Sequence, residues 1–386
     1  MQSSKISQPR RLDWTLLACV LVVLLVLGTE AVRWARAARA AATPSAVVAA
    51  PGARVALTPL SQSQIPMPQG VPSAHASSIT NLPGDRMLAV WWAGSRESGP
   101  DVKVFASRWA NGTWSAPWEV ASRESLGPAL GFGVRRIGNP VVWTDRDGKI
   151  HLYVVATGLG GWAASRIVHT VSSDHGASFG VRRVLPMSPL FNTSVLVRSS
   201  PVGLADGGWW LPVYFEIGIK YPMLMSFDAN GDPTALARIG ARTTTLQPAI
   251  VPVSATEVRA LMRDASDEQR VQHASSRDGG SSWQDLPPLA LSNHQTSLAV
   301  IRLNNGSFLM LHNPVERGGA RNILRLSMSQ DMHTWHTVSD IASGQAGDEF
   351  SYPTMQQVGD ELHVTYTHQR RAIAHHRYRI IAGESI

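Results

Sequence analysis

The chain has 386 residues, of which 44% are hydrophobic and 16% are charged, so it can bury one large core or two smaller ones and is not a disordered polymer. Its formal net charge is +7, but most of this charge lies before residue 40 and the rest of the chain carries only +3. That part contains no basic run with interleaved aromatics, which argues against nucleic acid as a partner. The single cysteine, Cys19, excludes a disulfide and a thiolate metal cluster from the folded part.

The sequence opens with a basic segment that is followed by an apolar run. Residues 14–28 are almost without interruption apolar, and lysine and arginine precede them. This order is typical of a secretory signal or a signal anchor. Extended through Val32, the run approaches the roughly 20 residues that a spanning helix needs. We therefore expect a basic region over residues 1–13 and, over 14–33, an uncleaved anchor that places the next domain outside the cytoplasm, on the periplasmic or cell-surface side.

Two further features concern this N-terminal part. Residues 16–19 (LLAC) look like a lipoprotein lipidation motif, but the apolar region continues for nine residues beyond Cys19, whereas that motif normally closes it. Lipidation at Cys19 and cleavage of the leader stay alternatives to an uncleaved anchor. Residues 34–52 are rich in alanine with some proline, which predicts a short helix that runs into a spacer. The folded domain is then expected over residues 53–386.

Three later stretches spell nearly the same turn, and each follows a strand-like run and ends on an aromatic residue. They are residues 172–179 (SSDHGASF), 276–283 (SRDGGSSW) and 329–335 (SQDMHTW). In such a turn, serine and aspartate can bond to the turn's own backbone, glycine supplies a positive φ, and the aromatic covers the sheet beneath. Degraded copies begin at Ser107 and Ser226. The repeat therefore indicates a unit of architecture.

The spacing of these turns predicts a ring of similar sheets. Their first serines fall at 107, 172, 226, 276 and 329, a period of about 55 residues with about four strands in each. The roughly 330 residues of the domain then give six blades, and seven is the alternative because the widest gap could hide a degenerate unit. A strand over 373–380 would pair with residues 55–60 to close the ring. The expected fold is all-β, a six-bladed β-propeller behind an N-terminal helix.

The repeated turns resemble the Asp-box, S-x-D-x-G-x-x-W/F, of sialidase-type β-propellers, and the resemblance covers about residues 60–380. It implies that the aspartates of the turns, Asp174, Asp278 and Asp331, are structural. It also implies an exo-α-sialidase-type hydrolase without a cofactor, in which three arginines hold a carboxylate, an aspartate is the general acid and a tyrosine activated by glutamate is the nucleophile. A phenol suits this task because an anionic substrate repels a carboxylate nucleophile.

Five residues match the positions that the resemblance assigns to catalysis. Arg96 and Asp101 lie five residues apart after a strand, which would make Arg96 an anion-binding residue and Asp101 the acid. Arg263 and Arg321 match the other two arginines, whose guanidinium forks bond a carboxylate at two places. Tyr352, shortly before the last strands, matches the nucleophile.

Two positions depart from the family pattern. His75 stands where the family has its first arginine, and Gln247 stands where it has the activating glutamate. Because glutamine cannot accept a proton, Tyr352 would need another base, and the available carboxylates are Glu216 and Glu349. Further polar residues lie beside strand-like runs and could reach a central pocket as substrate-binding residues: Asn139, Arg198, His312 and Asn313.

Two other functions stay open. One is β-elimination on a uronic-acid glycan, in which arginine neutralises the carboxylate and His75, His312 or Tyr352 moves the protons. The other is a propeller without catalytic activity that binds a glycan or an envelope partner. No metal is expected, since His375 and His376 face opposite sides of a strand. The sequence thus predicts an exported, membrane-anchored, sialidase-like glycosidase that acts on an acidic glycan or polysaccharide.

Overall fold

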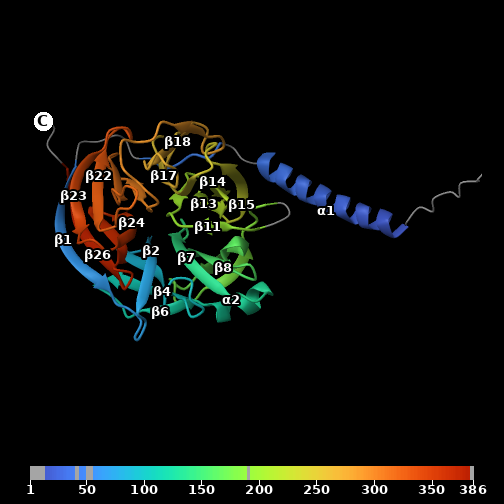
Figure 1. Ribbon diagram of the computed structural model, residues 1–386, viewed down its shortest axis with the longest axis horizontal. Helices are drawn as coiled ribbons and strands as arrows, with labels where there is room; N and C mark the ends of the chain where they lie inside the picture. The colour runs from blue at the N-terminus through green and yellow to red at the C-terminus, as the bar shows by residue number, and fades with distance from the viewer. Residues whose placement is uncertain (1–13, 40–42, 49–54, 189–191, 383–386) are drawn as a thin grey trace, which may run out of the picture.

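The strands of the protein form six antiparallel sheets that are arranged as blades around a central axis (Figure 1). The computed structural model describes residues 14–39, 43–48, 55–188 and 192–382. The first strands of successive blades contact one another, so they line the axis, and the last strands form the outer rim. This arrangement confirms the six-bladed β-propeller that the turn spacing predicts.

The first three blades contain two helical insertions between their strands. Blade 1 consists of β2 (Ser73–Leu82), β3 (Arg86–Gly94), β4 (Lys103–Ala110), β5 (Thr113–Trp114) and β6 (Trp118–Ala121). Blade 2 consists of β7 (Arg136–Thr144), β8 (Ile150–Thr157), β9 (Ser165–Ser172) and β10 (Gly180–Val184), and the helices nearby are α2 (Arg123–Leu130) and η1 (Gly161–Ala164). Blade 3 consists of β11 (Val195–Val197), β12 (Val202–Gly203), β13 (Trp209–Ile217), β14 (Ile219–Phe227) and β15 (Pro233–Arg238).

The other three blades have four strands each, and the last one takes its outer strand from the start of the domain. Blade 4 consists of β16 (Thr245–Pro252), β17 (Val258–Asp264), β18 (Gln272–Ser276) and β19 (Gln284–Leu286). Blade 5 consists of β20 (Ala299–Arg302), β21 (Phe308–His312), β22 (Ile323–Ser329) and β23 (His336–Ser343). Blade 6 consists of β24 (Phe350–Val358), β25 (Glu361–His368), β26 (Ala372–Ala382) and β1 (Val55–Ile65).

The ring is closed by the pairing of β1 with β26. The register runs from Val55 opposite Ala382 to Ile65 opposite Ile373, which confirms the expected closure. The wide gap between the first two repeated turns holds α2 and no seventh blade. Ser122 caps the start of that helix, and Gly131, with a φ of 69°, ends it.

Burial follows the order of the strands within a blade. A strand in the middle of a blade, such as β8, is buried on both faces and reads as a continuous apolar run, whereas the rim strand β23 is mostly exposed. The repeated turns hold themselves together as their chemistry predicts. Ser172 donates to Asp174 at 2.6 Å, and the amide of Ser178 donates to the same carboxylate at 3.0 Å. The aspartates of these turns are therefore structural.

A bulge recurs near the start of the inner strand of the blades. In four blades the pairing register is interrupted there, and in all six a residue other than glycine has a positive φ. Bulges re-aim side chains, and a positive φ at such residues is uncommon. All six positions therefore lie at one end of the central channel: Ala76 (57°), Asn139 (40°), Ser194 (53°), Gln247 (51°), Gln295 (53°) and Tyr352 (54°).

The N-terminal helix α1 (Trp14–Arg39) projects from the edge of the propeller beside blade 3 (Figure 1). Its segment Trp14–Val32 has a mean hydropathy of 2.5, is not buried, and is long and apolar enough to cross a membrane. Residues 43–48, which the sequence places in a spacer, instead lie against blades 3 and 4, where Ala46 forms a β-bridge with Leu204.

Candidate active site

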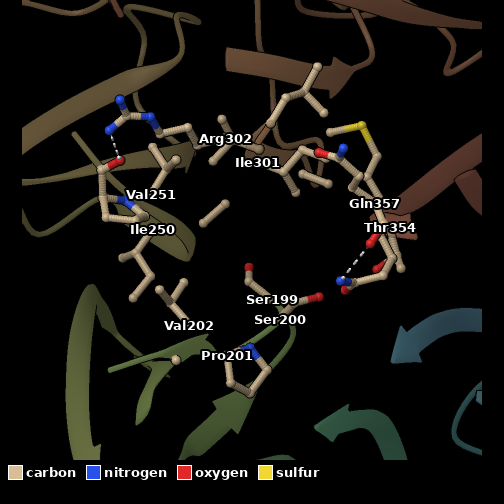
Figure 2. Close-up of a pocket in the computed structure, with 18 of the residues that line it drawn as sticks. Ser199, Ser200, Pro201, Val202, Ile250, Val251, Ile301, Arg302, Thr354 and Gln357 are labelled. Carbon is tan, nitrogen blue, oxygen red and sulfur yellow. Dashed lines mark hydrogen bonds between the residues drawn. The ribbon is translucent and has the colours of Figure 1, made fainter. Parts of the chain in front are cut away.

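Each end of the central channel has a cavity. The one at the bulged end has a volume of about 390 Å³, and its lining includes the carboxylates Glu97 and Glu216 together with Arg263 and Tyr352. The one at the opposite end is larger, about 720 Å³, and its polar lining is mostly uncharged, with Ser199, Ser200, Thr354 and Gln357 among the residues (Figure 2). Its titratable groups in the described chain are Arg198 and Arg302, both bonded to backbone carbonyls. The smaller cavity therefore has the chemistry of a site.

Tyr352 lies at the bulge of β24, and its side chain is in contact with groups from three other blades. Its hydroxyl accepts a hydrogen bond of 3.4 Å from Nε2 of Gln247. The His75 ring packs on its ring at a centroid distance of 4.1 Å, and the guanidinium carbon of Arg198 lies 5.0 Å from the ring centre. Burial is the largest single effect and opposes ionisation of Tyr352. The charge of Arg263, the hydrogen bond from Gln247 and the charge of Arg321 together outweigh burial and lower the pKa of Tyr352 below its usual value.

A second tyrosine, Tyr214 on β13, shares the amide of Gln247. The hydroxyl of Tyr214 lies 3.4 Å from Nε2 of Gln247 and 3.5 Å from Nδ2 of Asn139. Burial and the charge of Glu216 raise the pKa of Tyr214 far above its usual value. The two phenols of the cavity therefore have pKa values shifted in opposite directions. Tyr352 is the one that ionises more readily, and Tyr214 stays a neutral hydroxyl.

Three arginines from blades 4, 5 and 6 lie near the pair formed by Tyr352 and His75. Arg263 is at the end of β17, and its Nε is buried without a hydrogen-bond partner among the described residues. Arg321 donates to the carbonyl of Gln295 at 2.9 Å. Arg370, in the turn between β25 and β26, donates to Glu97 at 2.5 Å. Arg263 and Arg321 lower the pKa of Tyr352, and Arg370 lowers that of His75.

Glu349 joins two of these arginines. Its carboxylate accepts from Arg370 at 2.7 Å, from Arg321 at 3.3 Å and from Ser351 at 2.7 Å. Burial raises its pKa, but the bonds from Arg370 and Ser351 and the charges of both arginines outweigh burial and lower it. Glu349 is therefore an ionised partner of the arginines and is not free to act as a base.

His75 is buried beside Tyr352 as a neutral ring. Only 1% of the residue is exposed, and neither ring nitrogen has a hydrogen-bond partner in the described chain. Burial, followed by the charges of Arg370, Arg198 and Arg321, holds the pKa of His75 well below its ordinary value.

The structure brings some of the expected residues together and places others elsewhere. The expected residues Asn139, Glu216, Gln247, Arg263 and Tyr352 line the cavity. Arg96 and Asp101 do not, and His75 and Arg321 lie behind its lining. The exposed carboxylate of Asp101 accepts from the amide and hydroxyl of Ser95, both at 2.7 Å, so it fixes its own loop. Of that loop, Glu97 and Ser98 reach the cavity instead.

Three other expected residues have structural surroundings. His312 is buried and bonds to Ser327 at 3.1 Å, and burial together with Arg325 lowers its pKa to about 4. Asn313 donates to the backbone carbonyls of Ile323 and Phe350 at 2.6 Å. Arg198 is buried within the channel and donates to the carbonyls of Ser77 and Pro353.

Tyr214, Arg370 and Glu97 are the residues of the site that sequence reasoning missed. Glu97 directly follows the expected site residue Arg96, and Tyr214 lies two residues before the expected site residue Glu216, so their nearness in the sequence is the signal that points to them. Arg370 had none, because its turn uses Gln369 and Arg370 at positive φ without a glycine or asparagine to mark it.

A six-bladed ring with Asp-boxes, and with arginines and a tyrosine at one end of its axis, defines a sialidase-like β-propeller. The model of the BNR repeat-like domain matches residues 85–364, and the chain belongs to this family. No curated protein matches the chain.

Solved structures with the same fold include sialidases and a protein of unknown function. The latter, from Dyadobacter fermentans, has a TM-score of 0.67 and 16% identity over 86% of this chain and all of its own. The Hadza microbial sialidase Hz136 has a TM-score of 0.64 and 14% sequence identity over 80% of this chain. Trypanosoma rangeli sialidase has a TM-score of 0.63 and 16% sequence identity over 85% of this chain. The chain spans 66% and 60% of these two sialidases, and the likeness concerns the fold.

Proposed function

We propose that the protein is a membrane-anchored glycosidase that acts outside the cytoplasm on an anionic sugar of a glycan or polysaccharide. The observation that supports this most is Tyr352, a buried phenol whose pKa is lowered by Arg263 and Arg321 at the wall of the cavity. Cations that lower the pKa of a nucleophile also attract a substrate carboxylate, so one arrangement serves both tasks.

In the proposed reaction, Arg263 holds the carboxylate of the sugar, while Arg321, which is bonded to Glu349, adds positive charge behind the cavity wall. The phenolate oxygen of Tyr352 attacks the anomeric carbon, a glycosyl bond to Tyr352 forms, and the bond to the leaving oxygen breaks. The leaving oxygen takes a proton from water, and Glu216, a carboxylate on the cavity wall, then takes a proton from the water that releases the sugar. The arginines, and not a carboxylate base, thus activate Tyr352.

The test is a screen of the full-length protein in detergent against acidic oligosaccharides, with products identified by mass. Products that have gained water support hydrolysis. Tyr352→Phe should lower turnover roughly 1,000-fold, because the phenyl ring cannot attack. Tyr378→Phe, which removes the hydroxyl of a buried tyrosine of blade 6, is the matched control and should keep full turnover. Equal turnover in the two variants would refute the role of Tyr352.

Elimination on a uronic-acid glycan is the second candidate, and the position of His75 favours it. The neutral imidazole of His75 and the ionisable phenol of Tyr352, with ring centroids 4.1 Å apart, are two groups that could move the protons of a C–H and a C–O bond on the same side of a sugar. Elimination produces an unsaturated uronate that absorbs in the near ultraviolet and gains no water, so the same screen separates it from hydrolysis. A glycan that binds without any product would favour a propeller that only binds.

A further inference from the structure

The residues that follow the apolar helix are bonded to the propeller at one place on the ring. We name residues 43–48 the strap. The amide of Ala46 donates to the carbonyl of Ala255 at 2.8 Å, and the carbonyl of Ser45 accepts from the amide of Ala205 at 2.7 Å. Ala46 is only 4% exposed and packs in a core cluster with Leu204 and other residues of blades 3 and 4. The strap therefore joins the boundary between these two blades.

A glycine in the repeated turn of blade 4 makes room for the strap. A Cβ on Gly279 would lie 2.2 Å from the carbonyl oxygen of Pro44. The equivalent position in the turn of blade 2 is His175, so the turn itself does not require glycine there. Gly279 is thus fitted to the strap and not only to the local bend.

The strap lies at the end of the channel that is opposite the Tyr352 cavity. Strand β16 begins near Gln247 at that cavity and ends near the strap, while β17 starts at the strap side and ends with Arg263 at the cavity. Val47 and Val48 line the larger cavity at the strap end, the one drawn in Figure 2. Because β17 has seven residues and runs from the strap side to the cavity, the strap and the Tyr352 cavity are about 20 Å apart.

The strap also determines which edge of the ring lies nearest to the helix. Blades 3 and 4 are diametrically opposite blades 6 and 1, because the six blades follow one another around the axis in chain order. Helix α1 contacts β15, the outer strand of blade 3, and only three residues separate it from the strap. Three of the site's charged residues lie on the far blades: Glu97 on blade 1, and Glu349 and Arg370 on blade 6.

We propose that the strap holds the propeller with the edge of blades 3 and 4 next to the membrane, so that glycan reaches the cavity over blades 5, 6 and 1 from the aqueous side. The substrate is then an acidic glycan that extends into the aqueous phase, and not a short sugar head group on a lipid of the same bilayer. This inference rests on the proposed function, both for the substrate and for α1 as the membrane anchor.

The orientation is tested by lipid quenching in vesicles that contain the full-length protein. Cys19→Ser removes the only thiol, and single cysteines for a fluorophore then replace Ala235, exposed on the rim strand of blade 3, or Ser61, exposed on that of blade 6. A spin-labelled lipid headgroup should quench the Ala235 site roughly threefold more than the Ser61 site, since the edges lie across a body with a radius of gyration of about 20 Å. Equal quenching at the two sites, or stronger quenching at Ser61, would overturn the proposal.

The strap is tested by variants that release it. Ala46→Glu buries a charge at the bridge and Gly279→Val collides with Pro44, so each should bring the quenching ratio close to one. Ala56→Glu, at an exposed position of β1, is the matched control and should keep the ratio of the parent. Circular dichroism verifies that each variant is folded. A ratio that stays unchanged in both folded strap variants would contradict the role of the strap.

The substrate class is tested in the same vesicles. An acidic oligosaccharide that the parent cleaves in solution should be spared, by roughly tenfold or more, when it is attached by a short link to a lipid of the same vesicle, and Ala46→Glu should narrow this difference. Equal cleavage of both forms by the parent would overturn the substrate assignment. If no glycan is cleaved at all, the proposed function fails, while the quenching ratio still decides the orientation.

Discussion

Tyr352 and Tyr214 show how neighbours set the chemistry of a residue. Both are buried and both meet the amide of Gln247, yet Arg263 and Arg321 lower the pKa of Tyr352 while burial and Glu216 raise that of Tyr214. Burial alone would raise both pKa values, so the charges around each ring decide which phenol ionises first.

Titration of tyrosinate absorbance should detect this difference in the folded protein. Of the six tyrosines, we expect one to ionise below the usual value of about 10, and Tyr352→Phe should remove this early step. Arg263→Gln should move the step to higher pH, because it removes the largest favourable charge. Ionisation of all six at or above the usual value would contradict the assignment.

Gln247→Glu separates activation by arginine from activation by a carboxylate base. Gln247 is 2% exposed, so a carboxylate there would be buried against Tyr352 and would raise the pKa of that phenol. We expect turnover at neutral pH to fall about tenfold or more, since one pKa unit corresponds to about 1.4 kcal/mol. The pH dependence of kcat/KM measures this, and a rise in turnover would favour a carboxylate base instead.

Among the elements, the repeated turns and the bulged inner strands have separate tasks. The turns lie on the same side of the ring as the strap, and they stabilise the blades through hydrogen bonds between residues of the same turn. The bulges lie at the other end and turn Asn139, Gln247 and Tyr352 toward the cavity. Stability and chemistry can therefore be changed independently.

Asp278→Ala should lower stability without affecting turnover. The Asp278 carboxylate accepts from the hydroxyls of Ser276 and Ser282 at 2.7 and 2.6 Å and from the amide of Ser282 at 2.9 Å. Loss of these bonds to a charged group should cost about 2–3 kcal/mol in the free energy of unfolding, measured with urea. Asp267→Ala, which breaks an exposed pair with Arg317, should cost less than about 1 kcal/mol. Equal costs would contradict the structural role of the turn.

The sequence was sufficient for the fold but only partly for the site, for physical reasons that these elements illustrate. An Asp-box is complete within eight residues, so its spelling predicts its structure, and its spacing predicts the blades. Arg370 reaches the site only because β25 and β26 meet in a turn beside β2, where its carbonyl accepts from Ala74. Asp101 had the expected spacing, yet Ser95 holds its carboxylate in the loop. Convergence of this kind depends on tertiary packing that no local pattern encodes.

At the scale of the whole molecule, buried histidines connect the stability of the ring to pH. His151 bonds to His169 at 2.8 Å in blade 2, and His363 bonds to His375 at 3.0 Å in blade 6. Burial is the main cause that lowers their pKa values, to about 4 for His363 and about 2 for His169 and His375. The folded ring therefore keeps these side chains neutral.

Acid should destabilise the propeller well before its carboxylates are protonated. An unfolded histidine binds its proton near pH 6.5, so between that pH and about 4 the unfolded chain binds more protons than the folded one. Stability is complete above pH 6.5 and is lost as the pH falls, by up to about 1.4 kcal/mol per pH unit for each such histidine. The Tm of the full-length protein should fall steadily from pH 7 to pH 4.5, and a constant Tm over this range would contradict the expectation.

Arg198 lies between the two cavities of the channel, because it lines the larger one and its guanidinium lies over the ring of Tyr352, which lines the smaller one. The residue is 2% exposed, is bonded to the carbonyls of Ser77 and Pro353, and lies against the ring of Tyr352 in the middle of the channel. Side chains thus fill the passage between the two ends of the channel, so a sugar that enters the smaller cavity has to leave by the same opening. If the protein acts as proposed, this closed end favours the release of single sugars from chain ends, and internal fragments among the products of an acidic oligosaccharide would contradict that expectation.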